Sequence, residues 1–277
     1  MDKRLQVGGP TTCCCAAWIT EFKDYCSTRG VPIDFISTHA YTGGNENINS
    51  VSSVTSVLQQ AKAKADPIPL VITEFGSSYI PGTGNFTTGT SHDDYDAASF
   101  LVKLFTEAQG IAEVLSYWSI SDVFEEAGMP AVNASFNGDF GLVNIFGVPK
   151  PGYRALQLMH EAGSERISST VRGTGTCAHT VGALALAGNS SGSVRQSSTA
   201  SSGTTFSVLL YSQSARGVAI EDSCSVSLKI RLSSELSTLH SQPQTVECTV
   251  RRIDGDHANP SVHTLIVPKH VQDACPI

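Results

Sequence analysis

Continuous apolar runs and amphipathic stretches alternate along the first part of the chain. Four segments rich in β-branched and apolar residues have the texture of buried strands and begin near residues 5, 33, 70 and 114. Apolar side chains recur at helical spacing after each of them, over residues 18–29, 48–61, 93–108 and 153–162. A strand followed by a helix, repeated four times, predicts a parallel sheet with right-handed crossovers.

Turn and cap residues refine the expected boundaries. We expect the first strand to cover residues 5–10 and to stop at the Gly-Gly-Pro triplet that begins at Gly8. The first helix is expected to close at Gly30, and its apolar face is expected to carry Trp18, Ile19, Phe22 and Tyr25. The strand starts lie roughly 30 to 45 residues apart, and a (β/α)8 barrel averages about 31 residues per unit. This spacing suits a barrel with enlarged loops, but it does not separate a barrel from an open doubly wound sheet.

The texture changes beyond about residue 168. Gly, Ser and Thr dominate residues 170–203, and alternation in the later β-rich runs predicts strands with one solvated face. These runs cover residues 181–187, 205–211, 224–232 and 245–253. We therefore expect two domains, an α/β domain over residues 1–167 and a small antiparallel β domain over residues 168–277.

Composition limits the class of partner. The 277 residues are 40% hydrophobic and 16% charged, which is typical of a globular protein. A net charge of -7 argues against nucleic acid and anionic membrane surfaces as partners, because no basic stripe is present to neutralise phosphates. No apolar run is long enough to span a bilayer, and the first residues have no signal-peptide character. A neutral or weakly charged substrate fits this composition better.

The eight cysteines leave the compartment open. Cys13, Cys14 and Cys15 are consecutive, which is not a metal-ligand spacing, so no metal or other cofactor is expected. Two disulfides are expected in an oxidising compartment, among the cysteines of the C-terminal part: Cys177, Cys224, Cys248 and Cys275. Three glycosylation triplets, at Asn85, Asn133 and Asn189, favour an extracellular or lumenal protein.

Chemistry-bearing side chains collect where the predicted strands end. The apolar run from Leu70 delivers Glu74 into a Gly-Ser loop, and the other strand ends carry His39, Tyr41, Trp118, Glu125 and Glu126. Taken singly, each residue has an ordinary structural explanation. Glu74 would be a solvated residue at a strand end, Trp118 would fill the core, and His39 would be a buried histidine with its hydrogen bonds satisfied. Together at one sheet edge they supply a carboxylate nucleophile, an aromatic wall and hydroxyl-binding groups, which glycoside hydrolysis requires. Neither a dinucleotide fingerprint nor a P-loop is present, which disfavours nucleotide-binding enzymes. The one G-x-S-x-G match, at residues 188–192, lies in a Gly/Ser/Thr-rich stretch with no helix expected after it, which disfavours a serine-nucleophile enzyme.

Seven ordered blocks of the sequence resemble glycoside hydrolase family 39, and its β-xylosidase branch more than its α-L-iduronidase branch. The resemblance covers about residues 5–167 and resumes near residue 252. The blocks are residues 7–10, 34–41, 72–75, 116–126, 140–142, 149–151 and 252–260.

The resemblance implies a (β/α)8 barrel with an accessory β-sandwich, of which this chain contributes strands five to eight. It also implies a retaining mechanism on β-xylosides or related glycosides. Glu74 matches the nucleophile, and His39 and Tyr41 match the sixth-strand residues beside it. Trp118 matches an aromatic wall of the sugar subsite. Glu125 or Glu126 would bind sugar hydroxyls.

Two departures from the family pattern bear on activity. Family members usually have Trp-Asn after the nucleophile, where this chain has Phe75 and Gly76. The Asn-Glu-Pro motif that carries the family's acid/base glutamate is absent from the sequence. On this interpretation the chain is a C-terminal half that self-associates or pairs with an N-terminal half. The alternative is a non-catalytic carbohydrate-binding protein derived from a glycosidase.

Overall fold

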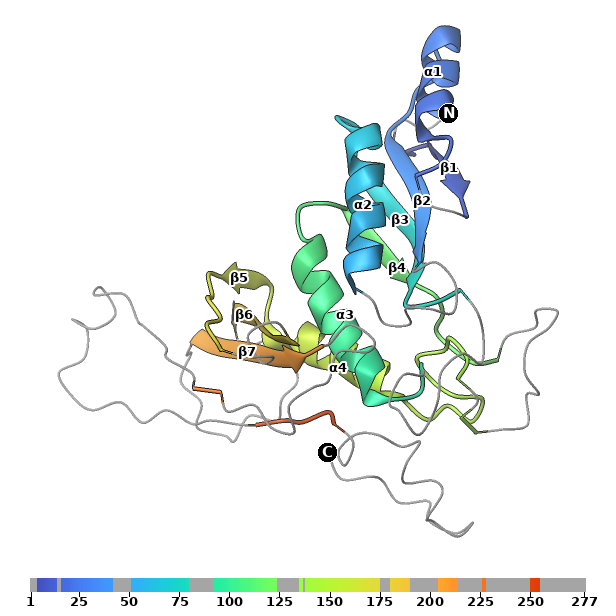
Figure 1. Ribbon diagram of the computed structural model, residues 1–277. Helices are drawn as coiled ribbons and strands as arrows, with labels where there is room; N and C mark the ends of the chain where they lie inside the picture. The colour runs from blue at the N-terminus through green and yellow to red at the C-terminus, as the bar shows by residue number, and fades with distance from the viewer. Residues whose placement is uncertain are drawn as a thin grey trace, which may run out of the picture.

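The protein is described from a computed structural model (Figure 1). The described residues are 4–13, 16–41, 51–79, 92–123, 135–136, 138–174, 180–189, 204–213, 226–227 and 250–254. The strands are β1 (Gly8–Thr12), β2 (Phe35–Tyr41), β3 (Leu70–Gly76), β4 (Val114–Tyr117), β5 (Glu165–Ile167), β6 (Val181–Asn189) and β7 (Thr204–Ser212). The helices are α1 (Ile19–Arg29), α2 (Val51–Ala65), α3 (Tyr95–Ala108) and α4 (Pro151–Ala162).

The first four strands form a parallel sheet in the order β1-β2-β3-β4. The predicted alternation of strands and helices is therefore confirmed as a mixed α/β fold with a parallel sheet. Strand order follows chain order without a reversal, unlike the order of a doubly wound sheet. Parallel strands bring their carboxyl ends to one edge, where β2 ends at Tyr41 and β3 ends at Gly76.

One face of this sheet packs against the helices α1, α2 and α3 (Figure 1). A single apolar cluster joins the sheet to these helices, and its fully buried members include Ile19, Ile36, Val54, Leu58, Leu70, Ile72, Phe75, Phe100, Leu101 and Leu104. Successive strand residues point to opposite faces, so the residues that flank Ala40 and Phe75 point away from the helices. These are His39, Tyr41 and Glu74.

An irregularity in β3 sets how the two central strands face each other. Thr38 pairs with Ile72, but the next residue, His39, pairs with Glu74, so Thr73 is an extra residue in β3. If the register continued without this irregularity, His39 would lie opposite Thr73. The bulge therefore places the imidazole-bearing residue of β2 directly beside the carboxylate-bearing residue of β3.

The predicted boundary of the first strand was wrong. β1 covers Gly8–Thr12, so the Gly-Gly-Pro triplet lies inside the strand instead of ending it. A Cβ on Gly8 would lie 2.2 Å from the carbonyl oxygen of Phe35, so β1 approaches β2 too closely for a side chain there. The fourth strand ends at Tyr117, and Ser121 forms only an isolated bridge, with Val143.

The apolar face expected for the first helix was also wrong in part. α1 ends at Gly30 as predicted, with the glycine in the left-handed region at φ 62°. Trp18 is 68% exposed at the N-cap, and Tyr25 is 56% exposed. The buried residues of α1 are Ile19 and Cys26, and Tyr25 instead stacks under the guanidinium of Arg29.

The last three strands form a separate antiparallel sheet in the order β5-β6-β7. The predicted runs at 181–187 and 205–211 correspond to β6 and β7, whereas β5 was not foreseen. The sheet packs on α3 and α4 through Leu184, Leu186 and Leu209 (Figure 1). The runs at 224–232 and 245–253 lie mostly outside the described residues, and the four C-terminal cysteines lie wholly outside them. Within the described part of the chain, no helix has the length and apolar character needed to cross a membrane.

Candidate active site

Glu74 lies at the carboxyl end of β3, on the sheet face that points away from the helices. Its strand is anchored by Leu70, Ile72 and Phe75, which are at most 1% exposed. The side chain of Glu74 itself is 27% exposed. The buried residues therefore fix the backbone, while the carboxylate between them reaches solvent.

Two side chains of β2 contact the same oxygen of this carboxylate. The hydroxyl of Tyr41 donates a hydrogen bond of 2.9 Å to Glu74 Oε2, and Nδ1 of His39 lies 3.2 Å from that atom. Among the described residues, none hydrogen-bonds to the other oxygen, Oε1. The sequence prediction that His39, Tyr41 and Glu74 meet at one edge is matched by these contacts. One carboxylate oxygen is held by β2, and the other has no hydrogen-bond partner among the described residues.

The residue after Phe75 makes room for the tyrosine. A Cβ on Gly76 would lie 3.1 Å from the ring of Tyr41, which is tighter than ordinary van der Waals contact. Phe75 points the other way, and its ring packs edge to face against Phe105 and Tyr117. The Phe75-Gly76 departure from the family pattern thus has a local consequence, because the absent side chain allows Tyr41 to lie close to β3.

Trp118 follows β4 at the same edge of the sheet. Its backbone N–H donates to the carbonyl oxygen of Phe75 at 2.9 Å, so its main chain is fixed one residue beyond Glu74. Its side chain is half-buried, which leaves part of the indole surface open. Glu125 and Glu126, the remaining predicted site residues, lie outside the described residues.

Comparison with known proteins places this arrangement in a family. The model of the family described as glycosyl hydrolases family 39 matches residues 1–267. The chain belongs to family 39. The resemblance read from the sequence blocks is thereby confirmed.

Similar family 39 proteins are β-xylosidases by description. The β-xylosidase of Caldicellulosiruptor saccharolyticus is 39% identical over 185 residues, which cover 60% of this chain and 35% of the relative. The β-xylosidase of Geobacillus stearothermophilus is 32% identical over 185 residues, with the same shares covered. A crystal structure of a monomeric β-xylosidase from Caulobacter crescentus CB15 has a TM-score of 0.53 and 27% identity, over 68% of this chain and 39% of that chain. The chain thus spans about a third of the length of the curated relatives it matches.

A second cluster of polar side chains, which the sequence analysis did not identify, lies around the start of α4 and the segments before α3 and after β4. Lys150 is fully buried and forms ion pairs with Asp93 and Asp122, which are at most 1% exposed. His92 is also buried, and its Nδ1 lies 2.7 Å from the carbonyl oxygen of Gly138. A lysine between two prolines at a helix start gives no sequence signal of burial, so only the fold identifies this group.

Burial perturbs the titration of several of these side chains. Burial raises the pKa of Asp122 to about 6, although the ammonium of Lys150 opposes the rise. Burial also lowers the pKa of His92 below its ordinary value, which favours the neutral imidazole. At the start of α3, burial raises the pKa of Asp94 to about 6 and that of Asp96 to about 7.

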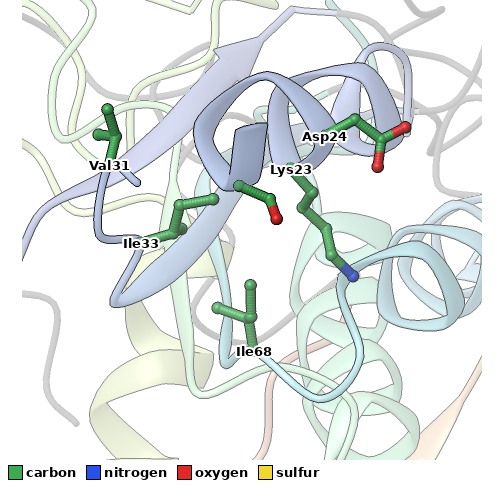
Figure 2. Close-up of a pocket in the computed structure, with 6 residues that line it drawn as sticks. Lys23, Asp24, Val31, Ile33 and Ile68 are labelled. Atoms are coloured by element: carbon green, nitrogen blue, oxygen red, sulfur yellow. The ribbon is translucent and has the colours of Figure 1, made fainter. Parts of the chain in front are cut away.

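The described residues hold no cluster of metal-binding side chains, and one hollow lies away from Glu74. No group of three His, Cys, Asp or Glu side chains in the described ranges could hold a metal ion. A hollow of about 360 Å³ lies at the amino-terminal ends of β2 and β3 (Figure 2). Its lining residues are Lys23, Asp24, Ser27, Val31, Ile33 and Ile68. Barrel enzymes place their chemistry at the carboxyl ends of the strands, so this hollow is not the candidate site.

Proposed function

We propose that the chain carries the nucleophile side of a retaining glycoside hydrolase that acts on β-xylosides or related glycosides. The observation that carries the proposal is the asymmetric environment of Glu74: Tyr41 and His39 contact Oε2, and Oε1 has no hydrogen-bond partner among the described residues. A carboxylate held by one oxygen presents the other toward an anomeric carbon. The β-xylosidase descriptions of two relatives favour xylosides as the substrate class.

The four-stranded sheet supports a partial (β/α)8 barrel as the scaffold. Strands in chain order with α1, α2 and α3 on one face form the arrangement of one arc of such a barrel. On this proposal the face that carries His39, Tyr41 and Glu74 points toward the barrel axis. Trp118 would form an aromatic wall for the sugar, and Glu125 or Glu126 would bind its hydroxyls.

Protonation of the leaving group requires a second carboxyl group about 5–5.5 Å from the first in a retaining enzyme. Asp122 follows β4 at the same edge, but it is buried and bound to Lys150 and to the N–H of Gly141. Asp93 is fully buried on the same lysine. Neither aspartate is therefore placed to reach a glycosidic oxygen. This observation favours a second candidate function, a carbohydrate-binding protein without catalysis.

A mechanism-based label separates the two candidates. We would incubate the purified chain with a 2-deoxy-2-fluoro-β-xyloside that bears a dinitrophenolate leaving group, which departs without an acid. Peptide mass spectrometry should find the sugar on Glu74, and E74Q should remain unlabelled while Glu113→Gln, an exposed carboxylate control, labels normally. Absence of label from folded protein that still binds xylose would overturn the hydrolase proposal and support the binding protein.

Partners beyond the sugar follow from the sheet edges. β1 and β4 each pair with one neighbour in the described part of the chain, so each presents an edge. Free parallel edges favour pairing with further strands. We propose self-association or pairing with another barrel half, and size-exclusion chromatography that found a stable compact monomer would contradict it.

A further inference from the structure

Lys150 is a fully buried charged side chain at the start of α4. It is 0% exposed, and its ammonium lies 2.5 Å from Asp93 Oδ1 and 2.7 Å from Asp122 Oδ2. It also donates to Asp122 Oδ1 at 2.8 Å and to the carbonyl oxygen of Asp139 at 3.0 Å. A buried ammonium is tolerated only when such partners compensate for its lost hydration.

The partners of Lys150 come from three separate segments. Asp93 precedes α3, Asp122 follows β4, and Asp139 lies in the chain that leads to α4. Lys150 itself is the N-cap residue of α4. One side chain therefore joins the chain before α3, the chain after β4 and the start of α4.

Asp122 connects Lys150 to the segment that follows Trp118. Its Oδ1 accepts from the N–H of Gly141 at 2.8 Å, and its own N–H donates to the carbonyl oxygen of Val143 at 3.0 Å. The N–H of Leu142 donates to the carbonyl oxygen of Ser119. A Cβ on Gly141 would lie 2.3 Å from the backbone nitrogen of Asp122, so the two segments touch without room for a side chain.

Residues 119–122 thus form a ladder with residues 140–143, and this ladder begins immediately after Trp118. The N–H of Trp118 is bound to Phe75, the neighbour of Glu74. The backbone of Trp118 is therefore held on two sides: by its hydrogen bond to β3, and by the ladder that Asp122 connects to Lys150.

We propose that Lys150 is a positioning residue for the Glu74 site: through Asp122 it fixes the segment after β4, and so the distance between the Trp118 indole and Glu74. Lys150 contacts no substrate. The effect on catalysis rests on the proposed function, because Trp118 matters for catalysis only if a sugar packs against its indole.

Lys23 provides a matched control at the opposite end of the sheet. Like Lys150, Lys23 has several hydrogen-bond acceptors. Its ammonium donates to the carbonyl oxygens of Lys64, Ala65 and Asp66 and so caps the end of α2. It lines the hollow at the amino-terminal ends of the strands (Figure 2). K23M should lower stability as the loss of a multiply bonded lysine does, without changing the surroundings of Trp118.

Fluorescence can report on Trp118 independently of activity. The sequence holds two tryptophans, so W18F leaves Trp118 as the sole tryptophan, whose emission is selected over that of tyrosine by the excitation wavelength. In that background we would compare K150M, D122N and K23M by acrylamide quenching and by hydrogen exchange of the amides of Trp118, Leu142 and Val143. In D122N the charge of Lys150 is still neutralised by Asp93, and the asparagine oxygen can still accept from the Gly141 N–H. D122N should therefore fold even if K150M, which leaves both aspartates without their lysine, does not.

The expected result is faster quenching of Trp118 and faster exchange at the ladder in K150M and D122N. Labelling of Glu74 by the fluoro-xyloside should fall by about tenfold or more, because small displacements in an active site have large effects on rate. K23M should change neither readout. Unchanged quenching and exchange in folded D122N would overturn the proposal, whether or not K150M folds. If the parent chain is not labelled while quenching still rises, the proposed function fails and the positioning of Trp118 stands.

Discussion

Tyr41 and Glu74 lie 33 positions apart in sequence and are joined by a 2.9 Å hydrogen bond from the tyrosine hydroxyl to Oε2. Adjacent parallel strands bring the two residues to one edge of the sheet. The bond orients the carboxylate and, by engaging one oxygen, distinguishes it from the other. A hydrogen bond to a charged group is worth more than a neutral one, so its removal should be measurable.

Y41F tests that hydrogen bond. The phenyl ring still fills its place beside Gly76, but the donor to Oε2 is lost. We expect Glu74 labelling by the activated fluoro-xyloside to slow by roughly tenfold, equivalent to about 1.4 kcal/mol, with little change in stability. Tyr79 packs edge to face on Tyr41 and is exposed, so Y79F is the matched control. Equal labelling rates in the two variants would contradict an orienting role.

G76A tests the close approach of the tyrosine ring. The new methyl group would lie 3.1 Å from the ring of Tyr41, so the ring must shift away from Glu74. We expect slower labelling of Glu74, by roughly tenfold, in a protein that remains folded. G9A introduces a similar contact, 3.1 Å from the ring of Phe22, far from the carboxylate. A G76A protein that labels as fast as G9A would show that Tyr41 does not need this space.

Phe75 should be the residue of β3 most sensitive to truncation. Its side chain is fully buried and packs edge to face on Phe105 and Tyr117. F75A should lower the free energy of unfolding by about 3–5 kcal/mol, the usual range for a phenylalanine removed from a core. I120A, at a residue 68% exposed, should change it by less than about 0.5 kcal/mol. Urea denaturation measures both, and similar values would argue that β3 is not in the core.

Stability should depend on pH through the carboxylates at the start of α3. The folded protein raises the pKa of Asp94 to about 6 and of Asp96 to about 7, chiefly because both are buried. The folded state then binds more protons than the unfolded state between about pH 4 and pH 7. The free energy of unfolding contributed by these groups therefore falls as pH rises through that window.

D96N isolates the larger of the two shifts, because the amide cannot ionise. The melting temperature of D96N should fall less between pH 5 and pH 8 than that of the parent protein. His92 acts in the opposite sense below about pH 6.5, since its lowered pKa means that acid favours the unfolded state, but it is common to both proteins. Parallel melting curves against pH would show that Asp96 is not the source of the dependence.

Two readings of the sequence failed for the same reason. Trp18 and Tyr25 have the spacing of an apolar helical face, yet both are exposed, whereas Ile19 of the same predicted face is buried against the sheet. Gly8 and Pro10 are turn residues by composition, yet they lie in β1, and at Gly8 the contact with Phe35 leaves no space for a side chain. In each case the deciding neighbour lies in another element.

The sequence by itself determined the parallel α/β framework and the gathering of His39, Tyr41, Glu74 and Trp118 at one edge. Both follow from local periodicity and from the rule that parallel strands end together. Only the tertiary structure decided that the strands lie in chain order with the helices on one face. It also decided that an extra residue, Thr73, sets His39 opposite Glu74, and that Lys150 is buried between two aspartates. Register and burial depend on atoms distant in sequence, so no local pattern specifies them.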